Sequence, residues 1–412
     1  MTSTPSERPR HVVIVGGGIA ALEAVLALHA LAGPRVGVTL VSPSPTFSLR
    51  PLSVLVPFGK GAPKQADLDE ILREHDGVFL QDAVLSVDGE RKVVVLAGGD
   101  ELEYDTLLLA PGARPVAEFD RGMTFDPFAA DALSGVVADL EQGWSRSVAF
   151  VVPEGVSWPL PLYELALMTA EQVWNMGMDD VGLHVVSPES SPLAIFGQEA
   201  SAAVAGLLSD ARITFHGGAA PRVPRAGLIE LGGGRQVEVD RIVALSRMEG
   251  PGLLGVPADA EGFIATDELG RVPGLPDVWA VGDATQQPIK QGGLACQQAD
   301  AAATHIAAEA GADVEPKPAV LELRGRLIAG RQERFLHRAV AEERSESDSH
   351  PLWWPPAKVA SRYLSPYLEE RGLVEPTPSE PEAEGMNVHV PIDWNAGRRS
   401  DVLGLSTLDP ES

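Results

Sequence analysis

The chain has 412 residues, 44% of them hydrophobic, one cysteine and a formal net charge of −26 at pH 7. This length supports two or three domains, whereas the acidic balance argues against a nucleic-acid partner and against membrane binding by charge alone. One cysteine excludes an intramolecular disulfide and a cysteine-based metal cluster.

The first ten residues are polar and carry Arg8 and Arg10, so we expect no signal peptide there. No later run is apolar and long enough to span a bilayer. We therefore expect a cytoplasmic protein. The histidines show no ligand spacing, so we expect no metal site.

An apolar run at 12–15 breaks into glycines and then into a helical pattern. The run has no polar face, which predicts a strand buried on both sides, and residues 19–31 predict a helix ending at Gly33. The three positions of the motif G-x-G-x-x-G/A are Gly16, Gly18 and Ala21. In this motif the first position allows a tight turn, the second lets a pyrophosphate approach the backbone, and the third lets the helix pack on the strand. The strand, motif and helix together predict a dinucleotide site.

A second strand is predicted at 36–41, and it ends at Ser42. Most dinucleotide folds place an acidic residue there to accept the ribose hydroxyls. A serine hydroxyl is a weaker partner for the same role. The following loop, with Phe47 and Arg50, should pass over the nucleotide.

The next elements are a short helix at 68–74 and two antiparallel strands at 78–87 and 92–96, joined by a turn at Asp88-Gly89. A buried strand then runs into Ala110-Pro111-Gly112. Far downstream, an apolar strand at 278–281 runs into Gly282-Asp283 in the same way.

In order and spacing, the glycine motif and these last two segments resemble the three flavin signatures of the two-dinucleotide-binding-domain flavoproteins, the pyridine nucleotide-disulfide oxidoreductase superfamily. Within it, the chain is most similar to the sulfide:quinone oxidoreductase, flavocytochrome c sulfide dehydrogenase and type II NADH dehydrogenase branch. The resemblance covers about residues 10–311. It implies an α/β fold with two Rossmann-like dinucleotide-binding domains, a small C-terminal α+β element and bound FAD.

The resemblance also implies how the chain divides and which residues hold FAD. The expected divisions are an FAD-binding domain in two parts (1–117 and 251–315), a second nucleotide-binding-like domain (118–250), a C-terminal interface or lid element (316–371) and a largely disordered tail (372–412). The expected FAD contacts are Gly16, Gly18, Ala21, Ser42, Arg50, Val84, Ala110, Pro111, Gly112, Gly282, Asp283, Gln291, Gly292, Gly293 and Leu294. Among them, the carboxylate of Asp283 is expected to accept hydrogen bonds from the ribityl chain.

Residues 291–294 should open a helix whose N-terminus points at the pyrimidine edge of the flavin. The positive end of a helix stabilises an anionic reduced flavin. Lys290 either assists there or is an ordinary solvated lysine.

The second domain departs from the usual nucleotide motif. Its first strand, 147–152, is followed by a loop that retains Gly155 but adds the bulk of Trp158 and two prolines, Pro159 and Pro161. Proline has no N–H group to hold phosphate, so we expect no NAD(P)H binding in the usual mode. In similar sulfide-oxidising proteins a cysteine precedes this turn. Here Ser157 and Trp158 stand there, so that cysteine relay cannot operate.

The resemblance places the Glu164 carboxylate near the reactive edge of the flavin. A shielded carboxylate there can move protons. The alternative is a glutamate favoured at a helix start by the helix dipole.

The C-terminal part carries less familiar patterns. We expect a hairpin about Gly325 within 320–331, a helix at 331–343, and an amphipathic helix from Val359 through Tyr367. Before that helix, Trp353-Trp354 stand close to Lys358, a pattern that suits contact with a membrane surface from which quinone enters. The alternatives are a homodimer contact or a lid on the flavin. Beyond Gly372, prolines and glutamates predict a tail that resists folding.

The sequence therefore predicts an FAD-dependent oxidoreductase that takes electrons from an unidentified small-molecule donor and passes them to an acceptor such as a quinone, with Glu164 and Lys290 as the catalytic candidates. Two alternatives stay open: a divergent NAD(P)H dehydrogenase and a flavin-binding partner protein without turnover.

Overall fold

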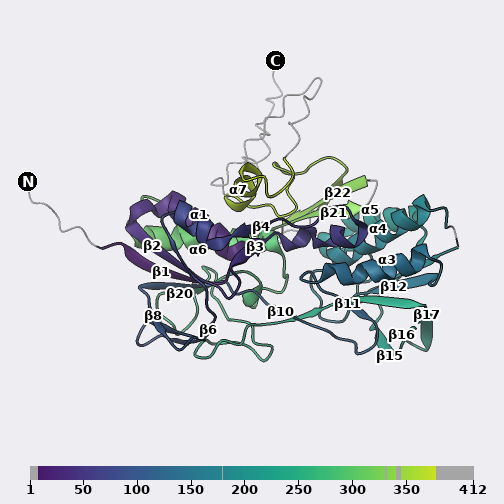
Figure 1. Cartoon of the computed structure of the whole chain (residues 1–412), viewed down its shortest axis with the longest axis horizontal. Helices are drawn as coiled ribbons and strands as arrows, with labels where there is room; N and C mark the ends of the chain where they lie inside the picture. Colours follow the sequence, from purple (N-terminus) through teal and green to yellow (C-terminus); the bar gives the residue numbers. More distant parts are fainter. Residues whose placement is uncertain (1–7, 179, 330–331, 340–344, 377–412) are drawn as a thin grey trace, which may run out of the picture.

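The computed structural model describes residues 8–178, 180–329, 332–339 and 345–376. Figure 1 shows an elongated molecule in which two α/β bodies lie along the longest axis. The C-terminal helix α7 (Leu364–Glu370) lies above the first body, and the strands β21 (Glu322–Ala329) and β22 (Gln332–Ala339) lie between it and the second body.

The first body is built on a parallel five-stranded sheet in the order β20-β9-β1-β2-β5. Its strands are β1 (Arg10–Val15), β2 (Val36–Val41), β5 (Val78–Leu80), β9 (Thr106–Leu109) and β20 (Val278–Ala280). Because the strands are parallel, the loops that follow β1, β9 and β20 meet at one edge of the sheet. The three glycine-containing segments singled out in the sequence are thereby brought together.

Both faces of this sheet are covered. Val12 and Ile14 pack with the helices α1 (Ile19–Ala32) and α6 (Gly292–Glu309), whereas Val13 and Val15 pack on the opposite side. That side is covered by an antiparallel meander of β6 (Val84–Asp88), β7 (Val93–Leu96) and β8 (Glu101–Glu103). The uniformly apolar sequence of β1 follows from burial on two faces.

The second body repeats this plan with a parallel five-stranded sheet in the order β11-β18-β12-β13-β14. Its strands are β11 (Met123–Phe125), β12 (Ser147–Val151), β13 (Gly182–Val186), β14 (Ile213–His216) and β18 (Arg241–Leu245). Its helices are α3 (Ser134–Glu141), α4 (Leu160–Asn175) and α5 (Gln198–Asp210). Two Rossmann-like units with a C-terminal α+β element confirm the predicted fold class.

Small elements join and extend the two bodies. The short strands β10 (Arg114–Val116) and β19 (Arg247–Glu249) pair antiparallel near the predicted domain boundaries at 117 and 250, which stay predictions. The other small elements are β3 (Thr46–Ser48), β4 (Gln65–Asp67), α2 (Leu68–Glu74), β15 (Arg222–Arg225), β16 (Leu228–Gly232) and β17 (Arg235–Glu238).

The helices predicted in the first body match the structure. The helix predicted at 19–31 is α1, and its C-cap Gly33 adopts φ +51°. The helix predicted at 68–74 is α2. The single strand predicted at 78–87 is wrong, because the chain breaks after Leu80 and continues as β6 in a different sheet.

The predicted C-terminal elements need larger corrections. The helix predicted at 331–343 is wrong, because residues 332–339 form β22 in the antiparallel sheet β21-β22-β23, where β23 is Ser345–Asp348. Adjacent side chains of β22 face opposite ways: Leu336 joins the core of the second body, and Phe335 packs against Trp353 at 5.2 Å between ring centroids. A strand buried on both faces lacks the alternation of polar and apolar residues that would reveal it.

Two further expectations about this region also fail. Gly325 is not a turn but lies in the middle of β21, where an added Cβ would stand 2.5 Å from the Phe196 ring. The amphipathic helix begins at Leu364 instead of Val359. The tail is predicted from 372, but Leu373 and Val374 pack against the core of the first body, and residues 377–412 lie outside the described residues.

Candidate functional site

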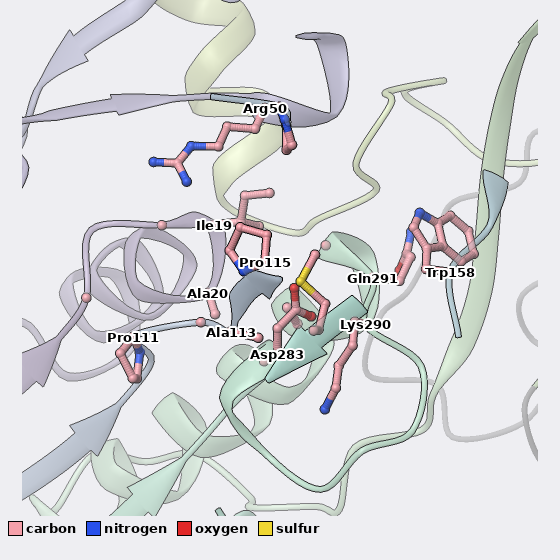
Figure 2. Close-up of a pocket in the computed structure, with 18 of the residues that line it drawn as sticks. Ile19, Ala20, Arg50, Pro111, Ala113, Pro115, Trp158, Asp283, Lys290 and Gln291 are labelled. Carbon is pink, nitrogen blue, oxygen red and sulfur yellow. The ribbon is translucent and has the colours of Figure 1, made fainter. Parts of the chain in front are cut away.

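One large cavity of about 1040 Å³ is lined by both α/β bodies and by the C-terminal element. Figure 2 shows Arg50, Trp158, Asp283 and Lys290 around it, and of these Asp283 and Lys290 both follow β20. The loops after β1, β9 and β20 form one part of its wall, and residues of α4, β21 and the 358–359 segment form another.

The loop between β1 and α1 is shaped by two glycines with different roles. Gly16 adopts φ +116°, and an added Cβ would lie 2.1 Å from the Ala110 carbonyl oxygen, so the neighbouring loop itself requires glycine here. An added Cβ at Gly18 would meet nothing within 4 Å, although this residue lines the cavity. The second glycine therefore leaves space for a ligand.

Helix α1 begins at this loop without a side-chain cap. Its first N–H groups and the positive end of its dipole are thus available to an anionic group. A pyrophosphate is the group that such a loop accommodates.

The loop after β20 contributes Asp283, which lies at the centre of the view in Figure 2. Within the described residues its carboxylate makes no hydrogen bond, and burial raises its pKa to about 6, against the opposing effect of Lys290. A carboxylate in this position calls for donors from a ligand, and ribityl hydroxyls are such donors. The glycine cradle, the uncapped helix and Asp283 therefore fit FAD.

Most of the residues predicted to hold FAD line this cavity, and their contacts with FAD stay predictions. The lining residues are Gly16, Gly18, Ser42, Arg50, Val84, Ala110, Pro111, Gly112, Gly282, Asp283, Gln291 and Gly292. Ala21, Gly293 and Leu294 lie behind the cavity wall. The N–H of Leu294 donates to Gln291 Oε1 at 2.7 Å, so the cap of α6 already occupies this donor.

Ser42 and Arg50 also have partners within the protein. The Ser42 hydroxyl donates to the Ser44 carbonyl at 3.1 Å. The Arg50 guanidinium stands 3.3 Å from the centroid of the Phe128 ring, and burial lowers its pKa against the effect of Asp126. Arg50 thus lies at the cavity wall, with a hydrophobic ring on one side.

Glu164 is fully buried and lines the cavity. Its Oε1 accepts hydrogen bonds from Lys358 Nζ and from the N–H of Ile328, the latter at 2.8 Å. Within the described residues its Oε2 is buried without a partner. Lys358 Nζ also donates to the Arg326 carbonyl at 2.7 Å. The Glu164 carboxylate is therefore paired with a lysine that lies 194 residues further along the chain.

Burial shifts both members of this pair toward their neutral forms. It raises the pKa of Glu164, against the effects of Lys358 and the Ile328 N–H, and it lowers the pKa of Lys358, against the effect of Glu164. These opposite shifts bring the two pKa values closer together. The state with the shared proton on Lys358 and the state with it on Glu164 therefore differ less in free energy than they would in water.

Lys290 lies on the Asp283 side of the cavity. Its Nζ donates to the Thr285 carbonyl at 2.5 Å and stands 3.7 Å from the centroid of the Phe263 ring. Burial lowers its pKa to about 8, whereas Asp283 acts to raise it. Lys290 is therefore a partly buried cation beside the predicted ribityl position.

The loop that follows β12 lines the cavity, and the acidic residue after β13 has hydrogen-bond partners inside the protein. Trp158 lines the cavity and packs near Phe196, with 5.7 Å between ring centroids. At the end of β13, where a dinucleotide fold presents its ribose-binding acid, Glu189 accepts a hydrogen bond from the buried Tyr163 hydroxyl at 2.8 Å and another from Ser187 at 3.1 Å. An acidic residue is therefore present after β13, but Glu189 already accepts hydrogen bonds from Tyr163 and Ser187.

Sequence reasoning placed Lys358 in a membrane-contact pattern and did not connect it with Glu164. The one local signal at Lys358 is a lysine set among small and apolar residues, Pro-Pro-Ala-Lys-Val-Ala, where a solvated lysine is unusual. Within the described residues, no cluster of three metal-ligating side chains occurs and no helix is both long and apolar enough to cross a membrane.

A family model described as pyridine nucleotide-disulphide oxidoreductase matches residues 10–151 and 164–304. The chain is 26% identical over 175 residues to a sulfide-quinone reductase of Aquifex aeolicus, a match that spans 41% of this chain and only 40% of that relative.

Among solved structures, the sulfide:quinone oxidoreductase of Aquifex aeolicus superposes with a TM-score of 0.76 at 20% identity, covering 82% of this chain and 86% of that one. A ferredoxin reductase of Rhodopseudomonas palustris superposes with a TM-score of 0.61 at 18% identity, covering 80% and 81%. At these identities the two structures show a shared fold.

We expect Gly18→Val to abolish FAD binding without unfolding the protein, since the valine fits the empty loop but occupies the pyrophosphate position. Gly37→Val is the matched control, because Gly37 also has open space and lies on β2 outside the cavity. Flavin absorbance of the purified variants is the measurement. A yellow Gly18→Val protein, or a wild type that takes up no FAD, would contradict the assignment.

We expect Lys358→Met to destabilise the protein by about 3 kcal/mol at neutral pH, because it leaves Glu164 buried without a cation. Adding Glu164→Gln should recover part of this loss. Denaturant midpoints of both variants give the comparison, and equal stability of wild type and single variant would argue against a buried ion pair.

Proposed function

The chain belongs to the pyridine nucleotide-disulphide oxidoreductase family and is an FAD-dependent oxidoreductase, and we propose that it passes electrons to a quinone-like acceptor with Glu164 as the proton relay. Bound FAD supplies the two-electron chemistry. The contribution of the protein is then to hold substrates, exclude water and move protons.

The buried Glu164–Lys358 pair is the observation that carries this proposal. Conversion of a quinone to its quinol takes up two electrons and two protons, and with an anionic reduced flavin as the donor one of these protons has to come from another group, for which a side chain inside the cavity is suited. Glu164 Oε2 is buried without a partner among the described residues, and its carboxyl lines the cavity. Lys358 can return a proton to Glu164 after each transfer, because the two groups share a direct hydrogen bond.

The electron donor is proposed to be neither NADH nor NADPH. Pro159 and Pro161 lack the N–H groups that hold a pyrophosphate, and Glu189 is occupied by Tyr163. These features support a second body that retains the dinucleotide fold without its ligand.

Sulfide oxidation through a pair of cysteines is also unsupported, although a sulfide-quinone reductase is among the relatives. Cys296 is the one cysteine of the chain, it lies buried in α6, and burial raises the pKa of its thiol. A buried thiol with a raised pKa is a poor nucleophile. The donor is thus proposed to be a small molecule that needs no cysteine.

Peripheral membrane contact accompanies the proposed acceptor, because long-chain quinones dissolve in the bilayer. The Trp353 ring is not free to insert there, since it is buried against Phe335. Lys358 and Val359 line the cavity, so the segment that follows the tryptophans supports the lid alternative. A homodimer through the C-terminal element stays a prediction of the sequence.

We expect neither NADH nor NADPH to reduce the flavin at a rate useful for turnover. Stopped-flow absorbance of the holoprotein is the measurement, with dithionite as the positive control for a reducible flavin. Rapid bleaching that saturates at micromolar nucleotide would favour the NAD(P)H dehydrogenase alternative.

We expect Glu164→Gln to retain FAD but to slow reoxidation of the reduced flavin by a short-chain benzoquinone by about 10²–10⁴-fold. Because burial raises the pKa of Glu164, wild-type reoxidation should be fastest below that pKa and slow as the pH rises through it, whereas the variant should lose this dependence. Glu171→Gln, on the same helix but paired with Lys60 near the surface, is the control. Unchanged rates across the pH range would leave Glu164 without a role as a relay.

A further inference from the structure

Glu23 is the one acidic residue in the sequence of α1, and it is fully buried. Its carboxylate receives the backbone N–H groups of three consecutive residues in the C-terminal segment. Oε1 accepts from Arg362 at 2.9 Å and from Tyr363 at 3.1 Å, and Oε2 accepts from Leu364 at 2.7 Å. A buried carboxylate is costly unless such donors surround it.

These hydrogen bonds define where α7 begins. The helix starts at Leu364, and its N-cap residue Tyr363 makes no side-chain cap. The Glu23 carboxylate satisfies the N–H of Leu364, and the Ser361 hydroxyl accepts from the N–H of Ser365 at 2.7 Å. Arg362 adds an ion pair with Asp300 of α6 at 3.6 Å. The start of α7 is thus held on the FAD-binding body.

The same segment carries Lys358 four residues before the first of these contacts. At that end, Lys358 is held by Glu164 and by the Arg326 carbonyl. Between the two ends, Val359 lines the cavity and Ala360 is buried. Residues 358–364, which we call the strap, therefore connect a carboxylate of the first body to a carboxylate of the second.

We propose that Glu23 is a positioning residue, which fixes the strap so that Lys358 reaches Glu164 inside the cavity. The importance of this placement for turnover rests on the proposed function of Glu164, but the placement itself does not. Without Glu23, three N–H groups lose their acceptor, and among the polar contacts of the described residues only the Arg362–Asp300 ion pair, the local Ser361 and Ser365 hydrogen bonds and the contacts of Lys358 itself are left to hold the strap. Displacements of about 1 Å remote from the chemistry can cost about 100-fold in rate.

The test is Glu23→Gln in the FAD-loaded protein. The amide keeps the size of the side chain but points an NH₂ group at backbone donors, so at least one of the hydrogen bonds is lost. Glu74→Gln is the matched control: Glu74 pairs with Arg371 and accepts from the Tyr367 hydroxyl at 3.1 Å, so it holds the other end of α7. Glu23→Asp, which keeps the charge, is the conservative variant.

The first measurement is the acetylation of Lys358 by acetic anhydride, followed by peptide mass spectrometry. We expect Lys358 to be protected in the wild type and in Glu74→Gln, to react at least several-fold faster in Glu23→Gln, and to be intermediate in Glu23→Asp. Equal protection in Glu23→Gln and the wild type would overturn the proposal. If Glu23→Gln does not fold, Glu23→Asp decides alone on the same readout.

The second measurement is reoxidation of the reduced flavin by a short-chain benzoquinone in a double-mutant cycle. If Glu23 acts through the Lys358–Glu164 pair, Glu23→Gln slows the wild type about ten- to 100-fold but has no further effect on Glu164→Gln. Additive losses would overturn the positioning role. If Glu164→Gln has no effect while Lys358 becomes reactive in Glu23→Gln, the relay is wrong and the positioning of Lys358 stands.

Discussion

The structure depends on the pairing of one buried carboxylate with a buried cation. Glu164 is fully buried on α4 of the second body, and the cation that pairs with it is Lys358, in the C-terminal element. Removing one partner from such a pair costs several kcal/mol, because the remaining charge stays buried. The C-terminal element is therefore not an appendage: the interior of the second body requires it in place.

The same logic explains why the cavity has two chemically different walls. Where β1, β9 and β20 end, backbone N–H groups and Asp283 offer hydrogen bonds that the protein itself does not use. At the corresponding place of the second body, Glu189 accepts a hydrogen bond from Tyr163, and Pro159 and Pro161 at the start of α4 have no N–H group to offer. Hydrogen-bonding groups without a partner in the protein favour the binding of a polar ligand. Groups that already have a partner in the protein do not need one. The same fold occurs twice in the chain, and the two copies differ in the polar groups that they present to the cavity.

The sequence predicted well wherever the signal was local. The strand, glycine turn and helix at 10–32 could be predicted because turn geometry requires Gly16 and helical spacing marks α1. It predicted poorly in the C-terminal element. There β22 has Phe335 and Leu336 on opposite buried faces, so no alternation of polar and apolar residues distinguishes a strand from a helix. The start of α7 could not be predicted, because its capping carboxylate, Glu23, comes from a helix about 340 residues earlier.

The sequence by itself determined the α/β fold class, the family signatures and the residues at the ends of β1, β9 and β20, because each of these depends on a few neighbouring residues and on the rule that parallel strands end at one edge. It also pointed to Glu164. Only the tertiary structure decided that Glu164 is paired with Lys358 and that Glu23 holds the segment between them. Burial and pairing of charge depend on contacts between residues hundreds of positions apart, and no local pattern in the chain records which carboxylate meets which cation.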